Sequence, residues 1–223
     1  MRRWKAGARR LIVADHRRRP GATREDTTML RTLAVAVTLA LAVPAFAQEA
    51  PMTPEQEAAM QAYMAAGAPG APHAALASSV GDYTLAIRSW DAPGAPPSDE
   101  AGTATRKMIL DGRVLVEQVQ ASMHGMHFTG HGMVGYDNVT GKWWQTWNDS
   151  MSTGVMLSHG DCDEHGSCTF EGSWTDPVTK RTMQSRFTNR WIDADTEVFE
   201  MYGPAADGTE YKMMEMTYTR RAD

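Results

Sequence analysis

Three glutamates lie inside runs of residues with the composition of β-strands, namely Glu117, Glu200 and Glu215. Successive side chains of a strand point to opposite faces, so Glu200 shares a face with Val198 and Tyr202. Carboxylates inside a protein must be paired or must serve a ligand. These acids are therefore the first candidates for a polar ligand site or for general acid–base chemistry.

The pattern leaves the direction of these faces open. Glu215 shares a face with Met213 and Thr217. If such faces point inward, a barrel interior holds carboxylates, with Arg186 or Arg190 as partners. If they point outward, the acids lie on the solvent-exposed face of the antiparallel sheet, which carries half of the strand residues.

Histidines and methionines are frequent in residues 123–131, where His124, His127 and His131 are the candidate metal ligands. His127 and His131 fall on one strand face, and Met with His suits copper in an oxidising compartment. Residues 48–223 contain 14 Met, however, and Met commonly fills cores. The sequence therefore predicts no metal site.

An aromatic strand follows, in which Trp143 and Trp147 share one face with Asp149 and Trp144 points the other way. An inward Trp147 beside Tyr136 would suit an apolar or flat ligand. Core packing explains the same residues equally well. No Gly-rich phosphate loop, G-x-S-x-G or H-E-x-x-H is present, so no catalytic residue and no cofactor is predicted.

Ten strand-like runs rich in β-branched, aromatic or Met residues position these side chains, separated by turn signals such as Asp111-Gly112 and Asp207-Gly208. No helix interrupts the series, which argues against a parallel sheet. We expect a mainly β fold, a closed or nearly closed antiparallel up-and-down barrel that encloses a cavity. The expected strands are 82–90, 100–110, 113–122, 126–136, 142–149, 153–160, 167–175, 180–191, 196–203 and 210–220.

One or two short helices are expected before the barrel. Thr53 can cap a helix, Pro54 suits its first position, and Gln56 completes a capping box, while Gly67 ends the helix. A shorter helix-like run covers residues 73–79. These helices could plug or cover one mouth of the barrel.

The two cysteines, Cys162 and Cys168, flank a polar turn between two strand-like runs. Residues facing each other in an antiparallel pair lie within disulfide range. The C-x₅-C spacing matches neither a zinc knuckle nor a C-x-x-C redox pair. We predict one structural disulfide.

Charge separates the amino-terminal part from the rest. Residues 1–28 carry nine basic and three acidic residues, whereas residues 48–223 carry 12 basic and 24 acidic ones. The acidic balance of the second part argues against nucleic-acid binding, because it repels phosphate. Residues 29–47 combine Arg31, an apolar run over 33–43 and an A-x-A site at 45–47, as a secretory signal peptide does.

We therefore expect a periplasmic or secreted protein, cleaved between Ala47 and Gln48, with no membrane span in the mature chain. Residues 1–28 are interpreted as a mis-annotated or disordered basic extension, residues 48–80 as a helical segment and residues 81–223 as the barrel domain.

Several motifs, taken in order, resemble the bacterial family called domain of unknown function 1579, over roughly residues 52–221. They are His73-x-x-Leu76-x-x-x-x-Gly81-x-Tyr83, Gly135-Tyr136-Asp137-Asn138, Trp147-x-Asp149-x-Met151-x-Thr153-Gly154-x-Met156, Phe199-Glu200-Met201-Tyr202 and Met214-Glu215-Met216-Thr217-Tyr218-Thr219-Arg220.

The resemblance implies a calycin-like barrel without an established activity, and it selects His73 at a helix start. The leading hypothesis is a barrel that binds a small apolar or amphipathic molecule. The alternatives are an enzyme with a cavity Glu or His as general acid/base, and an interaction module with a filled core. The candidate ligand-binding residues are His73, Glu117, Tyr136, Trp147, Asp149, Glu200, Tyr202 and Glu215.

Overall fold

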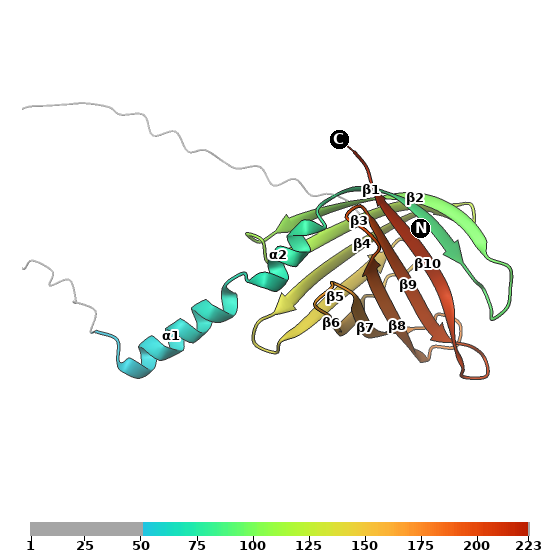
Figure 1. Ribbon diagram of the computed structural model, residues 1–223. Coiled ribbons are helices and arrows are strands. Elements are labelled where there is room, and N and C mark those ends of the chain that lie inside the picture. The colour runs from blue at the N-terminus through green and yellow to red at the C-terminus, as the bar shows by residue number, and fades with distance from the viewer. Residues whose placement is uncertain (1–50, 223) are drawn as a thin grey trace, which may run out of the picture. The chain divides into compact units, whose positions relative to one another are not determined.

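The structure, a computed structural model, describes residues 51–222 (Figure 1). The predicted extension, signal peptide and cleavage site lie outside these residues.

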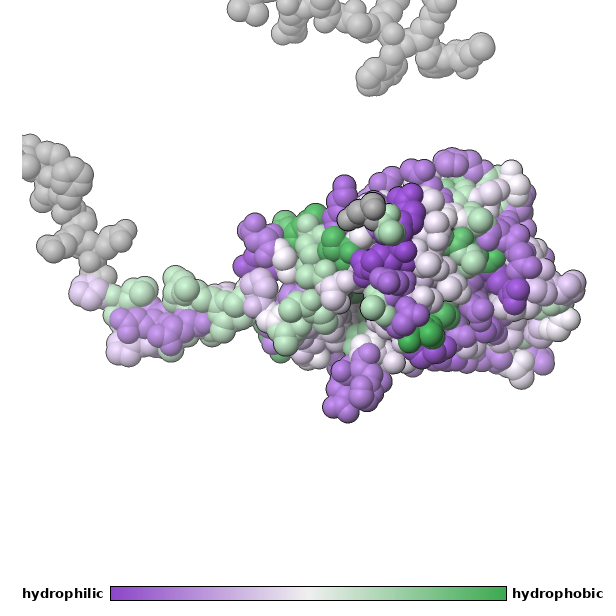
Figure 2. Space-filling model, turned by 45° about the horizontal axis from the view of Figure 1, so that its top comes forward, coloured by the Kyte–Doolittle hydropathy of each residue, from purple (hydrophilic) through white to green (hydrophobic). Residues whose placement is uncertain are grey.

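Two helices precede the strands, α1 (Pro54–Gly67) and α2 (Ala71–Ser78). The predicted capping box is present: the Thr53 amide donates to Gln56 Oε1 at 2.8 Å, and the Gln56 amide donates to Thr53 Oγ1 at 3.3 Å. No residue of α1 is buried, whereas α2 buries His73 and Leu76. Figure 2 shows apolar side chains along α1, where this helix extends away from the barrel. Of the two helices, only α2 has a side that packs on the strands.

Ten antiparallel strands form a closed barrel in which each strand pairs with its neighbours in sequence, and β1 pairs with β10. This confirms the predicted up-and-down barrel. The strands are β1 (Gly81–Ser89), β2 (Ser98–Ile109), β3 (Val114–Met123), β4 (Met126–Asp137), β5 (Lys142–Asp149), β6 (Met156–Cys162), β7 (Cys168–Thr175), β8 (Thr182–Trp191), β9 (Thr196–Pro204) and β10 (Glu210–Arg220).

The largest difference from the predicted strands is at β6, which begins at Met156 rather than at residue 153. The preceding residues form a loop that side chains of β5 hold. Asn148 Nδ2 donates to the Gly154 carbonyl at 2.9 Å, and the Met151 amide donates to Asp149 Oδ1 at 2.9 Å. These bonds satisfy one carbonyl and one amide of the loop backbone without a strand partner.

The buried core lies on the inner face of the strands around β1. Tyr83, Leu85 and Ile87 are buried and alternate with exposed residues. Val119 and Met216 join them from β3 and β10. This period of two places one face of every strand inside the barrel and the other outside.

Candidate functional site

A cavity of about 1330 Å³ lies inside the barrel. It reaches from the β6–β7 hairpin, below α2, to the loops over residues 150–155 and 176–180 at the other end. Ala75, Leu76 and Ser79 line it from α2 and the residue after it, so α2 covers one end. Its wall contains many aromatic and Met side chains, with Phe128, Trp147, Phe170, Phe187, Phe199 and Met216 among the lining residues.

Near the end covered by α2, the cavity wall carries a buried charge cluster of one arginine and two glutamates. Arg106 Nε donates to Glu117 Oε1 at 2.7 Å, and Arg106 Nη1 donates to Glu197 Oε2. Their side chains are only 7%, 13% and 6% exposed, respectively. Burial of a charged group costs free energy, because the group loses its hydration, and partners of opposite charge must offset that cost.

Two tyrosine rings lie against the guanidinium. The Arg106 Cζ atom lies 4.4 Å from the Tyr218 ring centroid and 5.0 Å from that of Tyr83. Burial alone would lower the pKa of Arg106, but Glu117 and Glu197 outweigh it and hold that pKa well above its ordinary value. Burial, aided by the charge of Glu117, raises the pKa of Tyr218 well above 10. Both groups therefore keep their protons at neutral pH.

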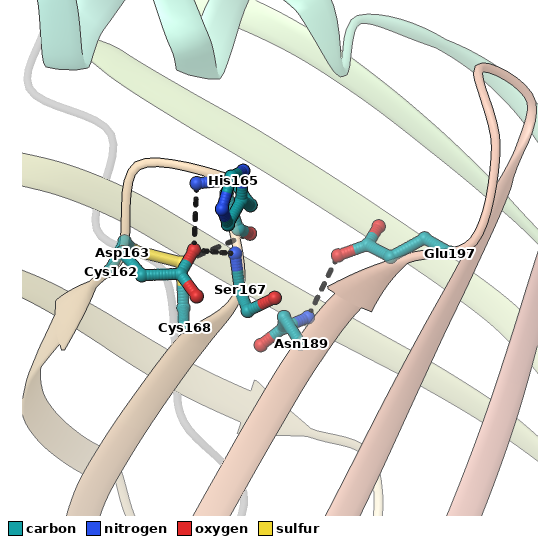
Figure 3. The surroundings of a disulfide bond; sticks show 8 residues. Cys162, Asp163, His165, Ser167, Cys168, Asn189 and Glu197 are labelled. Carbon is teal, nitrogen blue, oxygen red and sulfur yellow. Dashed lines mark hydrogen bonds between the residues drawn. A yellow bond between two sulfur atoms is a disulfide. The ribbon is translucent and has the colours of Figure 1, made fainter.

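Glu197 lies on β9 between two aromatic side chains of the neighbouring strands. Its register partners are Trp191 on β8 and Tyr218 on β10, and all three line the cavity. Asn189 Nδ2 donates to Glu197 Oε1 at 2.9 Å, which satisfies the oxygen that Arg106 does not contact. Figure 3 shows Asn189 and Glu197 facing each other close to the β6–β7 hairpin.

Three of the eight candidate residues, Glu117, Trp147 and Asp149, line the cavity. Trp147 Nε1 donates to Asp149 Oδ2 at 2.9 Å, and the Trp147 ring stacks on Phe128 with centroids 6.4 Å apart. The expected neighbour Tyr136 is not beside Trp147. In the β4–β5 register Tyr136 faces Trp143, four residues away along β5.

His73 and Tyr136 do not line the cavity but join α2 to the barrel wall. Their rings meet edge to face with centroids 6.2 Å apart. The Gly70 amide donates to His73 Nδ1 at 3.0 Å. His73 therefore holds the start of α2 and is not available to a molecule in the cavity.

Glu200, Tyr202 and Glu215 lie on the outer face of the barrel, so the inward direction considered above is wrong for them. On β9 the apolar residues Phe199 and Met201 take the inner face, which turns the residues between them outward. Lys212 Nζ donates to both Glu200 and Glu215, at 2.8 Å to Glu200. The bond from Lys212 to Glu200 lowers the pKa of Glu200.

The arginines proposed as interior partners are outside as well. Arg186 Nη2 donates to Glu210 Oε2 at 2.7 Å and its Cζ lies 4.0 Å from the Tyr202 ring centroid, while Arg190 is exposed. Met213 does not share the face of Glu215. The β9–β10 register shifts between Lys212 and Met214, and this bulge turns Met213 to the cavity wall.

The histidines of residues 123–131 do not gather. His127 and His131 are exposed on the outer face of β4, and His124 lies in the β3–β4 turn. Among residues 51–222, no three His, Cys, Asp or Glu side chains lie close enough together to hold a metal ion. No helix in this part of the chain has the length and apolar character needed to cross a membrane.

The residues that sequence reasoning missed are Arg106, Glu197 and Asn189. A signal for Glu197 was present, because it shares a strand face with Phe199 and Met201, and apolar faces point inward. Arg106 lies between Thr105 and Lys107 in a run that reads as polar, so nothing local marks it as buried.

The predicted disulfide between Cys162 and Cys168 is present and joins β6 to β7. The two cysteines are register partners at the ends of the hairpin. Asp163 Oδ1 accepts hydrogen bonds from the amides of His165 and Ser167, at 2.9 and 2.8 Å (Figure 3). The turn and the disulfide together form a fixed part of the cavity rim, since Cys162 and Cys168 both line it.

Among solved structures, the chain is similar to the S-type phycobiliprotein lyase CPES from Guillardia theta. The two are 10% identical, the match covers 70% of this chain and 96% of the lyase, and the TM-score is 0.50. A redesigned beta barrel matches with 13% identity, 66% and 96% coverage, and a TM-score of 0.34. The likeness to the lyase extends to the fold alone.

Comparison with curated protein sequences gives no match. The family described as protein of unknown function DUF1579 matches residues 68–220, which include α2 and all ten strands. The chain thus belongs to the DUF1579 family.

Proposed function

We propose that the barrel binds a small apolar or amphipathic molecule in its cavity. The observation that carries this proposal is the cavity of about 1330 Å³ with an aromatic and Met-rich wall and a buried charge cluster at one end. Ligand pockets are mostly apolar concavities with a few placed polar groups. An interaction module with a filled core would need that volume to be occupied by Trp and Met side chains, so the cavity favours binding over this alternative.

The first experiment identifies the occupant. The protein is purified from its own cell envelope and measured by native mass spectrometry, and a co-purifying mass names the ligand class. A clean apo mass, with no thermal shift across a panel of lipids and metabolites, would contradict binding.

A matched pair of variants tests whether binding takes place inside the barrel. Val134 lines the cavity, whereas its neighbour Met133 is exposed on the outer face of the same strand. We expect Val134→Trp to reduce binding by filling the cavity and Met133→Trp to leave it unchanged. Equal loss in both variants would place the ligand elsewhere.

We also propose that the chain is exported to the periplasm or secreted, with cleavage between Ala47 and Gln48. The signal-like pattern of residues 29–47 supports export, as does a disulfide, because disulfides persist in oxidising compartments. Mass spectrometry of the mature amino terminus tests this. A cytoplasmic chain that retains residues 29–47 would overturn it.

A further inference from the structure

The charges of the buried cluster do not balance. Arg106 is the one cation of the buried cluster, and Glu117 and Glu197 are two anions, which leaves one negative charge in excess when both are ionised. An isolated charge in a poorly hydrated site is costly unless a partner of opposite sign is supplied. A bound cation would supply that partner.

The cluster leaves one acceptor open towards the cavity. Both oxygens of Glu197 accept hydrogen bonds, from Arg106 and Asn189. Glu117 Oε1 accepts from Arg106, but Glu117 Oε2 accepts no hydrogen bond from residues 51–222. Glu117 Oε2 is not fully buried, and Glu117 lines the cavity. It is therefore an anionic acceptor that a ligand can reach.

The guanidinium is less open to an anion, because two of its three nitrogens already donate to glutamates. Its Nε and Nη1 atoms donate to Glu117 and Glu197, and the ring centroids of Tyr218 and Tyr83 lie 4.4 and 5.0 Å from its Cζ atom. A ligand carboxylate would also have to approach two glutamates of its own charge.

The remaining charges that line the cavity have the same bias. Among the described residues, Arg106 and Lys180 are the only Arg or Lys side chains that line the cavity. The acids that line it outside the cluster are Asp91, Asp149, Asp163, Glu164 and Asp176. These five acids lie at the ends of the strands and in the loops, and charges of one sign around a cleft concentrate ions of the opposite sign.

Aromatic residues lie on both strands next to Glu197. Glu197 lies between Trp191 and Tyr218 in the sheet register, and Phe187 and Phe199 line the adjoining wall. Carboxylates with aromatic faces suit ammonium groups, above all quaternary ones, because the ring faces carry negative charge. The Met-rich and Phe-rich remainder of the cavity suits an apolar body.

We propose that the cavity takes an organic cation, an amine or quaternary ammonium on an apolar body, with its charged group against Glu117 and Glu197. This rests on the proposed binding function and narrows it to one ligand class.

Three probes of equal chain length test the charge preference on the unaltered protein: octyltrimethylammonium, 1-octanol and octanoate, each titrated calorimetrically while monomeric. We expect the cation to bind about tenfold more tightly than the alcohol, octanoate to bind more weakly than either, and added salt to weaken only the cation. Octanol or octanoate binding as tightly as the cation would overturn the charge preference and leave the proposed function standing. Binding of none of these probes, nor of any molecule in the lipid and metabolite panel, would overturn both.

Variants then locate the charged group. Glu117→Gln and Glu197→Gln should each weaken the cation about tenfold and leave octanol unchanged. Glu200→Gln on the outer face is the matched control and should change neither affinity. An equal effect of all three substitutions would contradict a head-group site at the cluster, and the comparison of probes on the unaltered protein decides the charge preference even where a variant does not fold.

Discussion

The Trp147 ring lies against Gly130 of the neighbouring strand, so closely that a Cβ atom on Gly130 would be 2.3 Å from Cζ2 of the ring. At Gly132 the corresponding distance to Trp147 Cε3 is 3.2 Å. The two glycines therefore form a recess in the inner wall that accepts the indole and leaves the cavity open beside it.

We expect Gly130→Ala to destabilise the barrel by roughly 1–3 kcal/mol, because the added methyl group overpacks the wall. Gly132→Ala is the control on the same strand and should cost less, since the ring has to yield by less. Urea unfolding gives the two values, and Trp fluorescence reports the ring. Unchanged stability in Gly130→Ala would mean that the ring moves freely.

The buried cluster should be sensitive to loss of its cation. We expect Arg106→Met to destabilise the fold by roughly 3–5 kcal/mol, because two carboxylates then lose their partner in a poorly hydrated site. Adding Glu117→Gln and Glu197→Gln to this variant removes those charges and should restore part of the loss. No recovery in the triple variant, measured by urea unfolding, would indicate that Arg106 acts through packing alone.

The outer cluster offers a comparison of the same chemistry at higher exposure. Lys212 contacts Glu200 and Glu215, and these three side chains are 23–31% exposed. Water screens such pairs, so Lys212→Met should cost less than about 1 kcal/mol. A loss of stability as large as that of Arg106→Met would contradict the assignment of Lys212 to the surface and of Arg106 to the core.

The fold could be predicted from short-range sequence patterns. Turn residues such as Asp207-Gly208 and the alternation of apolar residues predicted all ten strands, since both depend on a few consecutive residues. The β6 boundary was misplaced because Asn148 and Asp149 hold the following loop through side-chain bonds that composition does not reveal.

The site was predicted less well because it depends on which face is buried. Glu200 was weighed for the interior although Phe199 and Met201 beside it are the more apolar pair, and the inward acid is Glu197. The position of Met213 could not be predicted at all. The bulge at Met213 arises from the pairing of β10 with β9, so the sequence of residues 210–220 alone does not reveal it.

The disulfide should contribute to stability mainly through the unfolded chain. It closes a loop with a sequence separation of only 6, so Cys162→Ser combined with Cys168→Ser should cost about 2 kcal/mol. Unfolding with and without reductant measures this, and the double variant should be insensitive to reductant. Because both cysteines line the cavity rim, ligand affinity should be measured on the same pair of samples.

Acid should destabilise the fold through its turns. Asp137, Asp176, Asp193 and Asp207 each have a lowered pKa, and in each case the largest cause is a hydrogen bond donated within the same turn. Glu200 also has a lowered pKa, because Lys212 donates a hydrogen bond to it. A lowered pKa in the folded state means that the unfolded chain binds more protons in acid.

The stability from these carboxylates is therefore complete above their unfolded pKa values, near 4, and is lost as the pH falls through the folded values. The urea midpoint should stay nearly constant between about pH 7 and 5 and then fall steadily below about pH 4.5. Asp207→Asn keeps an acceptor for the Thr209 amide, which donates to Asp207 Oδ1 at 2.9 Å, but removes one titrating group. Its decline in acid should be shallower than that of the unaltered protein, and an equally steep or steeper decline would show that this turn does not contribute.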